Sequence, residues 1–447
     1  MSSTLPIEEG AESTTSSLLP LPLGNADFRM IRLRKLTYID KTHFIYSLMQ
    51  SGGQAFFLSR PRRFGKSLFL DTLSHFFSGH RELFKGLWIE NKGGQEVYPV
   101  LRLDLSIKAI IAPKAIERYL CRTFLRIAKE WGLSLTSTDD YAILLEELIY
   151  ETYQKRGPVV ILIDEYDSFI NEFLHIPSKA QKLINTFRPL FATLKSCQNY
   201  IRFLFVTGVT RYASLNFFSA INHLIDISFD SKFSTILGFT EEEIRQNLSV
   251  WLQYVAERRK VTLEVIWEEL RNWYNGYIWE GEPVYNPFSL LHYLEHAKAK
   301  DYWFSAGASP QLIINLLRTY KYDLSSIEHV PISQAELNST DIEYPNLPSL
   351  LLQTGYLTFS GKELVDEMGN TFYYLRLPNH EVRSAFKEHL LKTYFPLQKG
   401  NSYLSTSLLL NALKTGDTET FLNFWNTVWA KLPYNLHLPY ESYYHSL

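Results

Sequence analysis

The first half of the chain alternates between short apolar runs and longer amphipathic segments. The apolar runs have the length of buried strands, and they lie at residues 55–58, 100–105, 159–163, 203–207 and 226–229. Between them, apolar residues recur at helical spacing, at about residues 69–77, 113–129, 138–155 and 179–195. Strands that alternate with helices form a parallel sheet covered on both faces, so the pattern predicts a three-layer α/β domain.

Beyond Thr240 the pattern becomes helical. Apolar spacing predicts helices at about residues 241–258 and 261–273. The first of them opens with a capping box, in which Thr240 is followed three residues later by Glu243. We therefore expect a small helical lid after the α/β domain.

A third pattern follows, in which helices precede a hairpin. Helices are predicted at about residues 310–320 and near Pro348. Two strand candidates, residues 356–359 and 372–377, then flank a polar loop that contains glycines. Helices followed by a hairpin suggest a winged-helix-like module.

The length of the chain, 447 residues, exceeds that of one ordinary domain and predicts several units. Hydrophobic residues make up 46% of the chain and charged residues 21%, which is typical of globular proteins. The changes of pattern predict a disordered tail at 1–20, the α/β domain at 21–240, the lid at 241–300, the winged-helix-like module at 301–392 and a helical segment at 393–447.

Composition excludes several classes of protein. A formal net charge of -2 gives no global attraction to nucleic acid. Cys121 and Cys197 are too few for a disulfide framework, and no cysteine and histidine cluster has the spacing of zinc ligands. The apolar run 159–163 is typical of the longest here and is far short of the ~20 residues that cross a bilayer. The first residues lack a signal sequence, so we expect a cytoplasmic protein.

Candidate chemistry begins with the segment 60–67, which lies between a predicted strand and a predicted helix. Backbone N–H groups and the helix dipole make such a loop a binding site for phosphate. Lys66 would reach the β- and γ-phosphates of ATP, and the Ser67 hydroxyl would bind Mg²⁺, as in the Walker A loop of P-loop NTPases. Arg60 stands where that motif has its first glycine, and a basic surface loop is the alternative interpretation. The expected nucleotide-binding residues are Arg62, Arg63, Phe64, Gly65, Lys66 and Ser67.

A pair of acidic residues follows the apolar strand 159–163, about a hundred residues after the loop. Asp164 would hold the magnesium ion, and Glu165 would orient or deprotonate the attacking water, as in a Walker B motif. Two solvated carboxylates at a strand end are the alternative. We expect Asp167, further on, to be a solvated neighbour.

The next strand ends at Thr207, whose hydroxyl could bind the attacking water or the γ-phosphate. Arg211 follows four residues later and could neutralise charge in the transition state, in its own site or in that of a neighbouring subunit of an oligomer. The alternatives are an ordinary strand-end threonine and a structural salt bridge.

These residues, together with further motifs, resemble the predicted AAA-ATPase-like family of microbial proteins. The resemblance runs from about residue 21 to about residue 391, and in this family arginine is usual at the position of Arg60. The further motifs are Tyr38-Ile39-Asp40-Lys41-Thr42, Leu237-Gly238-Phe239-Thr240, Tyr274-Asn275-Gly276-Tyr277, Tyr285-Asn286-Pro287, Tyr302-Trp303-Phe304, Gln353-Thr354-Gly355-Tyr356-Leu357-Thr358 and Leu377-Pro378-Asn379-His380-Glu381-Val382.

The resemblance implies roles for two segments near the nucleotide. It implies that Asp40 to Thr42 lie at the entrance of the ATPase domain, where related ATPases contact the base. Residues 285–287 fall near the lid and could approach the adenine, although a packed aromatic helix junction is the alternative.

The resemblance also implies a C-terminal domain similar to the PD-(D/E)XK nucleases, in which carboxylates and a lysine bind metal. Residues 439–447 look like its first helix, with Glu441 in place, and the strands with the other ligands are missing. Asp417 and Glu419 are expected at a solvated turn and helix start. We therefore interpret 393–447 as a helical remnant of that domain and expect no nuclease activity from this chain.

Three functions remain open at this point. The first is an ATP-driven switch, in which nucleotide binding closes the lid and alters what the C-terminal module binds. The second is a DNA-associated ATPase, although no dense stripe of lysine and arginine marks a recognition helix. The third is a non-catalytic scaffold for a protein partner, with a vestigial nucleotide site.

Overall fold

The computed structural model describes residues 18–92, 96–106, 112–136, 139–212, 224–304, 313–316, 331–337, 342–343, 345–394 and 411–429. Five strands form a parallel sheet in the order β2-β3-β4-β1-β5. Their bounds are β1 (Ala55–Ser59), β2 (Val100–Asp104), β3 (Val159–Asp164), β4 (Ile201–Gly208) and β5 (Leu224–Asp226). The parallel sheet is confirmed, and its last strand lies slightly earlier than predicted.

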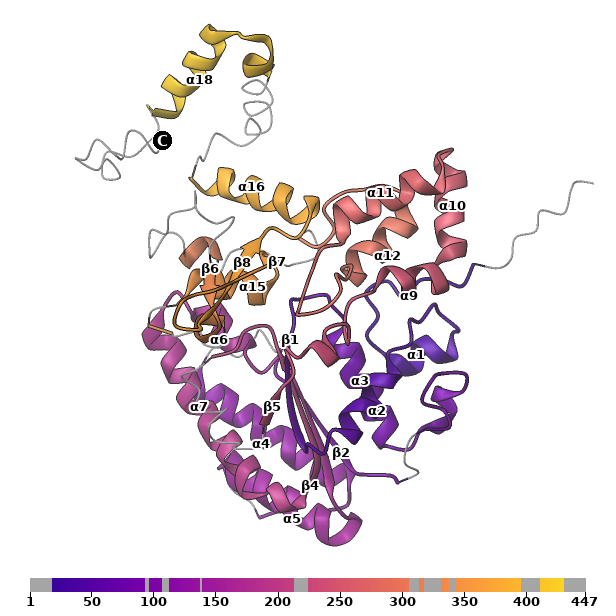
Figure 1. Cartoon of the computed structure of the whole chain (residues 1–447). Helices are drawn as coiled ribbons and strands as arrows, with labels where there is room; N and C mark the ends of the chain where they lie inside the picture. Colours follow the sequence, from indigo (N-terminus) through magenta and orange to yellow (C-terminus); the bar gives the residue numbers. More distant parts are fainter. Residues whose placement is uncertain are drawn as a thin grey trace, which may run out of the picture.

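Helices cover both faces of this sheet (Figure 1). The helices α2 (Thr42–Gln50) and α3 (Lys66–Phe77) lie on one side of it. The helices α4 (Pro113–Glu130), α5 (Tyr141–Arg156) and α7 (Pro177–Ser196) lie on the other. The predicted three-layer α/β arrangement is therefore present. Among the described residues, no helix combines the length and the apolar character needed to cross a bilayer.

The strand β3 shows why the apolar runs become central strands. Every residue from Val159 to Asp164 is buried, and the strand is paired on both sides, with β2 and with β4. Gly157 ends α5 with a φ of 87°, which reverses the chain into β3. Because all strands are parallel, their carboxyl ends lie along one edge of the sheet, where ligands of such folds bind.

The segment predicted to form the lid, residues 241–300, contains four helices, and we keep the name lid for them. They are α9 (Glu241–Asn247), α10 (Ser249–Arg259), α11 (Leu263–Tyr274) and α12 (Pro287–His296). The capping box is present, with the Thr240 side chain accepting from the amide of Glu243 and the Glu243 carboxylate accepting from that of Thr240. One expected helix at 241–258 is in fact two, because the backbone leaves the helical conformation at Leu248.

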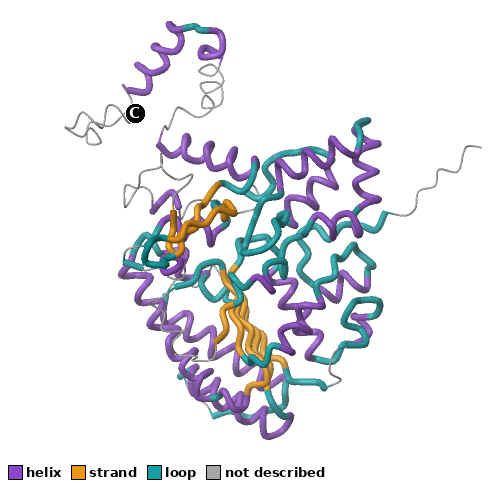
Figure 2. The backbone as a smooth tube through the Cα atoms, in the orientation of Figure 1, coloured by secondary structure: helices purple, strands orange, loops and turns teal. Residues whose placement is uncertain are grey.

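The hairpin module, as we name residues 301–392, contains a second, antiparallel sheet in the order β6-β8-β7 (Figure 2). The predicted hairpin is confirmed by β7 (Thr358–Val365) and β8 (Thr371–Arg376). The helix expected near Pro348 is α15 (Leu347–Thr354), and α16 (His380–Tyr394) follows the hairpin. The winged-helix-like assignment and the domain boundaries stay predictions.

Shorter elements complete the described chain. They are α1 (Phe28–Leu33), η1 (Arg81–Phe84), α6 (Ser168–Phe173), η2 (Gln198–Tyr200), η4 (Ser231–Phe233), β6 (Pro331–Ser333), α14 (Gln334–Leu337) and α18 (Thr418–Trp429). Asp417 is exposed and accepts from the amide of Thr420 at the start of α18, as expected. The predicted tail up to residue 17, most of the predicted helix 310–320 and Glu441 lie outside the described residues.

The apolar side chains form two cores. The larger core is continuous from the α/β domain into the hairpin module, and it contains Phe64 together with Trp303 and Leu351. The smaller core belongs to the lid helices, and Leu21 and Ile39 from the N-terminal segment join it. The hairpin module is therefore packed as part of the α/β domain, whereas the lid has a core of its own.

A buried carboxyl group, Glu381, joins the lid to the hairpin module. Its Oε1 accepts from the amides of Tyr302 and Trp303, at 2.8 and 2.9 Å, and from the hydroxyl of Ser289 in α12, at 3.0 Å. Burial raises the pKa of Glu381 to about 8, an effect that the charge of Asp301 reinforces and the two amides oppose. Glu381 is therefore protonated at neutral pH.

We expect Glu381→Gln to change how stability depends on pH. Between about pH 4.5 and 8 the folded protein keeps a proton on Glu381 that the unfolded chain releases. The contribution of Glu381 is thus complete below pH 4.5 and is lost as pH rises toward 8, by up to about 1.4 kcal/mol per pH unit. Glutamine does not titrate, so the variant lacks this loss. The free energy of unfolding of the variant minus that of wild type should therefore be larger at pH 8 than at pH 5. Urea unfolding of both proteins at the two pH values measures this difference, and parallel pH profiles would contradict it.

Candidate nucleotide-binding site

The loop of residues 60–65 connects β1 to α3 at the carboxyl edge of the sheet. Gly65 stands immediately before the helix with a φ of 97°, a left-handed conformation that glycine adopts without steric cost. Arg63 also has a positive φ, 70°. These two residues turn the chain so that α3 begins at Lys66, with its first amides at the loop. This is the geometry of an anion site at a helix N-terminus.

The side chain of Lys66 is buried inside this loop. Its Nζ donates to the carbonyls of Arg60 and Pro61, at 2.8 and 2.9 Å. An ammonium group has three N–H bonds, so among the described residues one is left for a ligand. Burial lowers the pKa of Lys66, and the negative charges of Glu165, Asp164 and Asp167 oppose that change. Lys66 and the carboxylates after β3 therefore lie within electrostatic reach of each other.

Arg60, the departure from the glycine motif, is a buried structural cation. Its guanidinium donates to the carbonyls of Ser59, Ser228 and Phe233, at 2.9, 2.6 and 3.3 Å. The same group lies 4.3 Å from the ring centroid of Trp279. Burial lowers the pKa of Arg60 to about 9, which leaves it charged at neutral pH. Arg60 thus holds the loop to the segment after β5.

Asp164 and Thr207 lie side by side at the ends of β3 and β4. Thr207 is fully buried, and its hydroxyl donates to Oδ1 of Asp164 at 2.6 Å. This bond orients the carboxylate. The sequence predicted for Thr207 either contact with a water or the γ-phosphate or an ordinary place at a strand end. The bond to Asp164 was not predicted, because the strand order that makes β3 and β4 neighbours was not.

Glu165 follows Asp164, and its backbone has a conformation that is unusual for a residue other than glycine. Its φ is 50°, in the left-handed region that costs non-glycine residues free energy and occurs often at functional sites. Burial raises the pKa of Glu165, and the charge of Lys66 opposes this. Glu165 lines the same cavity as Lys66.

The expectation that Asp167 is solvated was wrong. Asp167 is 1% exposed, and its carboxylate accepts from the amides of Val209 and Thr210 and from the side chain of Asn171. Its neighbour Tyr166 donates to the carbonyl of Thr210 at 2.7 Å. These bonds tie the turn after β3 to the loop after β4. The acid three residues after Asp164 was visible in the sequence, but the two amides that it accepts from lie more than forty residues away.

Arg211 forms the structural salt bridge that was one of its two expected roles. Its guanidinium lies 3.0 Å from a carboxylate oxygen of Asp226, at the end of β5. Its amide donates to Oε1 of Gln353 in the hairpin module, at 2.7 Å. Arg211 is not among the residues that line the cavity described next. A catalytic role for it stays a prediction.

A cavity of about 470 Å³ extends from the loop to the lid. One end is polar and contains residues 62–67 with Glu165 and Ser106. The other end is mainly apolar, and its lining includes Ile39, Leu237, Leu248, Phe288 and Leu291. A pocket of this size with one polar and one apolar end fits a ligand that carries phosphate groups and a flat ring.

The apolar end shows how the two segments implied by the family resemblance are used. Lys41 lines the cavity and forms an ion pair with Glu243, at 2.6 Å, so the entrance segment is tied to the lid. Asn286 caps α12 through the amides of Phe288 and Ser289. The neighbouring Phe288 lies in the lining, with the guanidinium of Arg63 at 4.8 Å from its ring centroid. Of the segment 285–287, Pro287 lines the cavity, whereas Tyr285 and Asn286 are fully buried and are not among the lining residues. The approach of this segment to an adenine stays a prediction.

Not every residue of the loop turns its side chain to the cavity. Phe64 is 1% exposed, and its ring packs edge-on against Tyr277 and Trp279, at centroid distances of 4.8 and 5.2 Å. The side chain of Phe64 belongs to the core, so only its backbone is suited to a ligand. The carbonyl of Arg62 accepts from the indole of Trp303 at 3.0 Å.

The residues expected to bind magnesium fit a hard cation. The hydroxyl of Ser67 and the carboxylate of Asp164 are the oxygen ligands that Mg²⁺ prefers. A carboxylate accepts several bonds, so Asp164 can bind a cation while it keeps the hydrogen bond from Thr207. Lys66 and Ser67 are the first two residues of α3, and both line the cavity.

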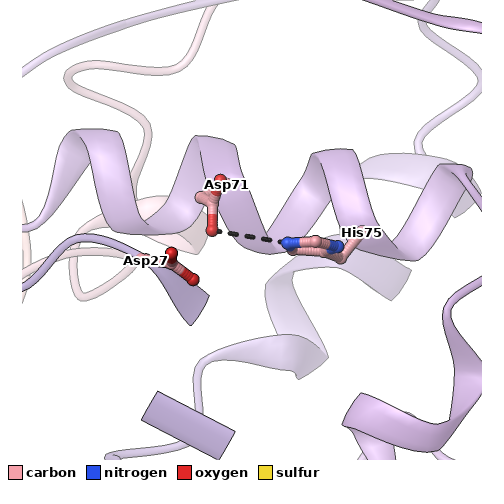
Figure 3. Close-up of side chains that lie close together, drawn as sticks. All are labelled: Asp27, Asp71 and His75. Atoms are coloured by element: carbon pink, nitrogen blue, oxygen red, sulfur yellow. Dashed lines mark ion pairs between the residues drawn. The ribbon is translucent and has the colours of Figure 1, made fainter. Parts of the chain in front are cut away.

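A second group of possible ligands, Asp27, Asp71 and His75, lies on α3 and beside it (Figure 3). Asp71 accepts from the amide of Phe28 and forms an ion pair with Arg102. Burial lowers the pKa of His75, and its Nε2 lies 3.7 Å from Asp71. Because Arg102 already neutralises Asp71, we interpret this cluster as structural. It holds α1 and β2 against the helix that begins at Lys66.

The comparisons with known proteins agree with this geometry. Residues 22–218 match the sequence model of the family described as Predicted AAA-ATPase. Over 435 residues the chain is 32% identical to an "Uncharacterized protein in vnfD 5'region" of Azotobacter chroococcum mcd 1, an alignment that covers 96% of this chain and 81% of the relative. The chain belongs to the predicted AAA-ATPase family. In this member of the family, the loop, the buried lysine and the two carboxylates form the candidate nucleotide site.

Two solved structures were also found similar to this AAA-ATPase family member, each at 10% identity. The Aeropyrum pernix ORC1 protein in complex with DNA has a TM-score of 0.29, with 78% of this chain and 91% of the other covered. Drosophila ORC bound to AT-rich DNA and Cdc6 has a TM-score of 0.23, with 81% and 91% covered. At these TM-scores the likeness carries no argument about fold or function.

We expect Arg60→Gly, which restores the general glycine motif, to destabilise this protein. The change removes donors from three buried carbonyls and leaves space over Trp279, so the free energy of unfolding should fall by about 2–4 kcal/mol. Denaturant unfolding measures it, with Arg34→Gly at an exposed position as the control. Equal stability of the two variants would contradict a structural role for Arg60.

Proposed function

We propose that this protein binds ATP with magnesium, hydrolyses it, and thereby changes how the lid and the hairpin module sit on the α/β domain. The observation that carries the proposal is the convergence of three features at one cavity. They are the N-terminus of α3 with buried Lys66, the carboxylate of Glu165 after β3, and the apolar lining from the lid. Asp164 is not among the lining residues, but it lies within electrostatic reach of Lys66. Membership of the predicted AAA-ATPase family supports the same chemistry.

Each residue has a defined part in this proposal. Lys66 and the amides at the start of α3 bind the β- and γ-phosphates. Ser67 and Asp164 hold the metal, which when bound neutralises charge that develops on the phosphate oxygens. Glu165 accepts the proton of the attacking water, and its raised pKa makes it a stronger base than an exposed carboxylate. Thr207 keeps Asp164 in position.

The lid supplies the switch. Its helices form a core distinct from the larger one, with Leu21, Ile39 and Tyr302 as members from outside the lid, so these helices can move as a unit. Phe288 and Leu291 of α12 line the apolar end of the cavity, where a base would contact them. A bound nucleotide would thus contact both the lid and the α/β domain, and it favours the arrangement in which the lid closes on the α/β domain.

We expect Lys66→Ala to abolish ATP binding or nearly so, because it removes the cation best placed to meet the β- and γ-phosphates. Isothermal titration calorimetry with ATP and magnesium measures the affinity. Lys92→Ala, at an exposed lysine outside the cavity, is the matched control. An unchanged affinity in Lys66→Ala would refute the assignment of the loop.

We expect Glu165→Gln to keep ATP binding and to slow turnover by roughly a hundredfold or more, the usual scale of a general base. The amide retains the size of the side chain but cannot take a proton. Steady-state phosphate release together with calorimetry separates the two effects. Parallel loss of binding and turnover would instead mean that Glu165 is structural.

A DNA-associated ATPase is the second candidate, and one surface feature favours it. A second cavity, of about 430 Å³, lies between the end of α11 and the start of α16. Arg376, His380 and Arg383 line it, and none of its lining residues is acidic. Such a lining suits phosphate groups. Turnover measured with and without duplex DNA separates this function from a switch that acts on proteins alone.

A further inference from the structure

The last turn of α15 contacts both loops of the nucleotide site within three residues. Gln353 is 4% exposed, and its Oε1 accepts from the amide of Arg211, in the loop after β4. Its Nε2 donates to Ser349 at 2.9 Å and to the carbonyl of Leu337 at 3.3 Å, both within the hairpin module. Every polar atom of the Gln353 amide is thus used to join that loop to the module.

Gly355, two residues later, packs directly on the phosphate loop. It ends α15 with a φ of 89°, and a Cβ atom there would lie 2.7 Å from the ring of Pro61 and 3.4 Å from Trp303. The backbone of the hairpin module therefore lies so close to Pro61 that no side chain fits at residue 355. The position has two independent requirements for glycine, a left-handed φ and the absence of a side chain.

Trp303 provides a second contact with the phosphate loop and connects it to the lid. Its indole N–H donates to the carbonyl of Arg62 at 3.0 Å. Its amide donates to Glu381, which also accepts from Ser289 in α12. A chain of hydrogen bonds therefore runs from the loop through Trp303 and Glu381 to α12, the lid helix whose Phe288 and Leu291 line the cavity.

We propose that Trp303 and Gln353 are positioning residues through which the hairpin module controls the nucleotide site and senses what it holds. Trp303 sets the position of the phosphate loop, and Gln353 sets that of the loop after β4, the strand that contains Thr207. This inference rests on the proposed ATPase function and adds to it the route of regulation. A partner that moves the hairpin module would alter nucleotide binding and turnover together.

The two contacts predict different defects, because they act on different loops. Trp303→Phe keeps an aromatic ring but removes the donor to Arg62, so ATP binding should weaken about three- to tenfold, the scale of one lost hydrogen bond. Gln353→Leu removes the acceptor for Arg211, so kcat should fall by a similar factor while ATP affinity stays within about twofold. General destabilisation would instead weaken both quantities together.

The chain offers matched controls for both variants. Trp251 also donates from its indole to a backbone carbonyl at 3.0 Å, that of Leu19, outside the site, so Trp251→Phe removes an equal bond. Thr354 neighbours Gln353, but its hydroxyl bonds only within α15, so Thr354→Ala tests damage to that helix. Both controls should match wild type in ATP affinity and kcat.

Hydrogen exchange provides the reciprocal measurement, because coupling between two sites acts in both directions. Amides of residues 347–358 in wild type should exchange about three- to tenfold more slowly when a non-hydrolysable ATP analogue with magnesium is bound. In Trp303→Phe this protection should be lost at analogue concentrations that saturate the site. This readout stays informative if Gln353→Leu does not fold.

The outcomes are distinguishable. If wild type fails to bind ATP, the proposed function itself fails. If wild type binds and hydrolyses ATP while the variants behave as Trp251→Phe and Thr354→Ala do, or if exchange at 347–358 ignores the analogue, the control by the hairpin module is overturned and the ATPase assignment stands. Split defects with nucleotide-dependent exchange support the inference.

Discussion

The arrangement of the whole nucleotide site depends on one buried positive charge, the guanidinium of Arg60. It satisfies carbonyls from β1 and from the segment after β5, and it lies against Trp279, while the amide of Arg60 bonds the end of β4 at Gly208. A charge can be buried only when such partners surround it. If the partners separated, the guanidinium would be left buried without hydrogen-bond acceptors, at a large cost in free energy. The phosphate loop, usually the flexible part of such sites, is here fixed to three neighbouring segments.

The local features of this fold could be predicted from the sequence, and the long-range ones could not. Short apolar runs such as 159–163 identified the strands, and the Thr240 and Glu243 pair marked the start of a helix, because these signals involve residues close together in the chain. The break at Leu248 was missed, since apolar spacing continues across it. Strand order and the shared core were missed because they depend on contacts between distant segments.

In the candidate site too, the features that depend on nearby residues could be predicted from the sequence and the long-range contacts could not. Lys66 was identified from its place between a strand and a helix, and Asp164 and Glu165 from their places at a strand end, and the three lie within electrostatic reach of one another. The burial of Asp167 depends on amides of the next strand, and the contact between Trp303 and Arg62 spans 241 positions. Spacing alone carries no signal for such pairs, even though Trp303 and Gln353 stand in motifs that the sequence made visible.

The continuous core of the α/β domain and the hairpin module has a consequence for how the protein reaches its native state. A ribosome releases the chain from its N-terminus, so the five-stranded sheet emerges before the residues that complete its core. Until Trp303 and α15 have been synthesised, the part of the larger core that they complete beside Pro61 stays exposed to solvent, and the nascent α/β domain has an apolar surface that chaperones can bind. The lid, with a core of its own, can form during that interval.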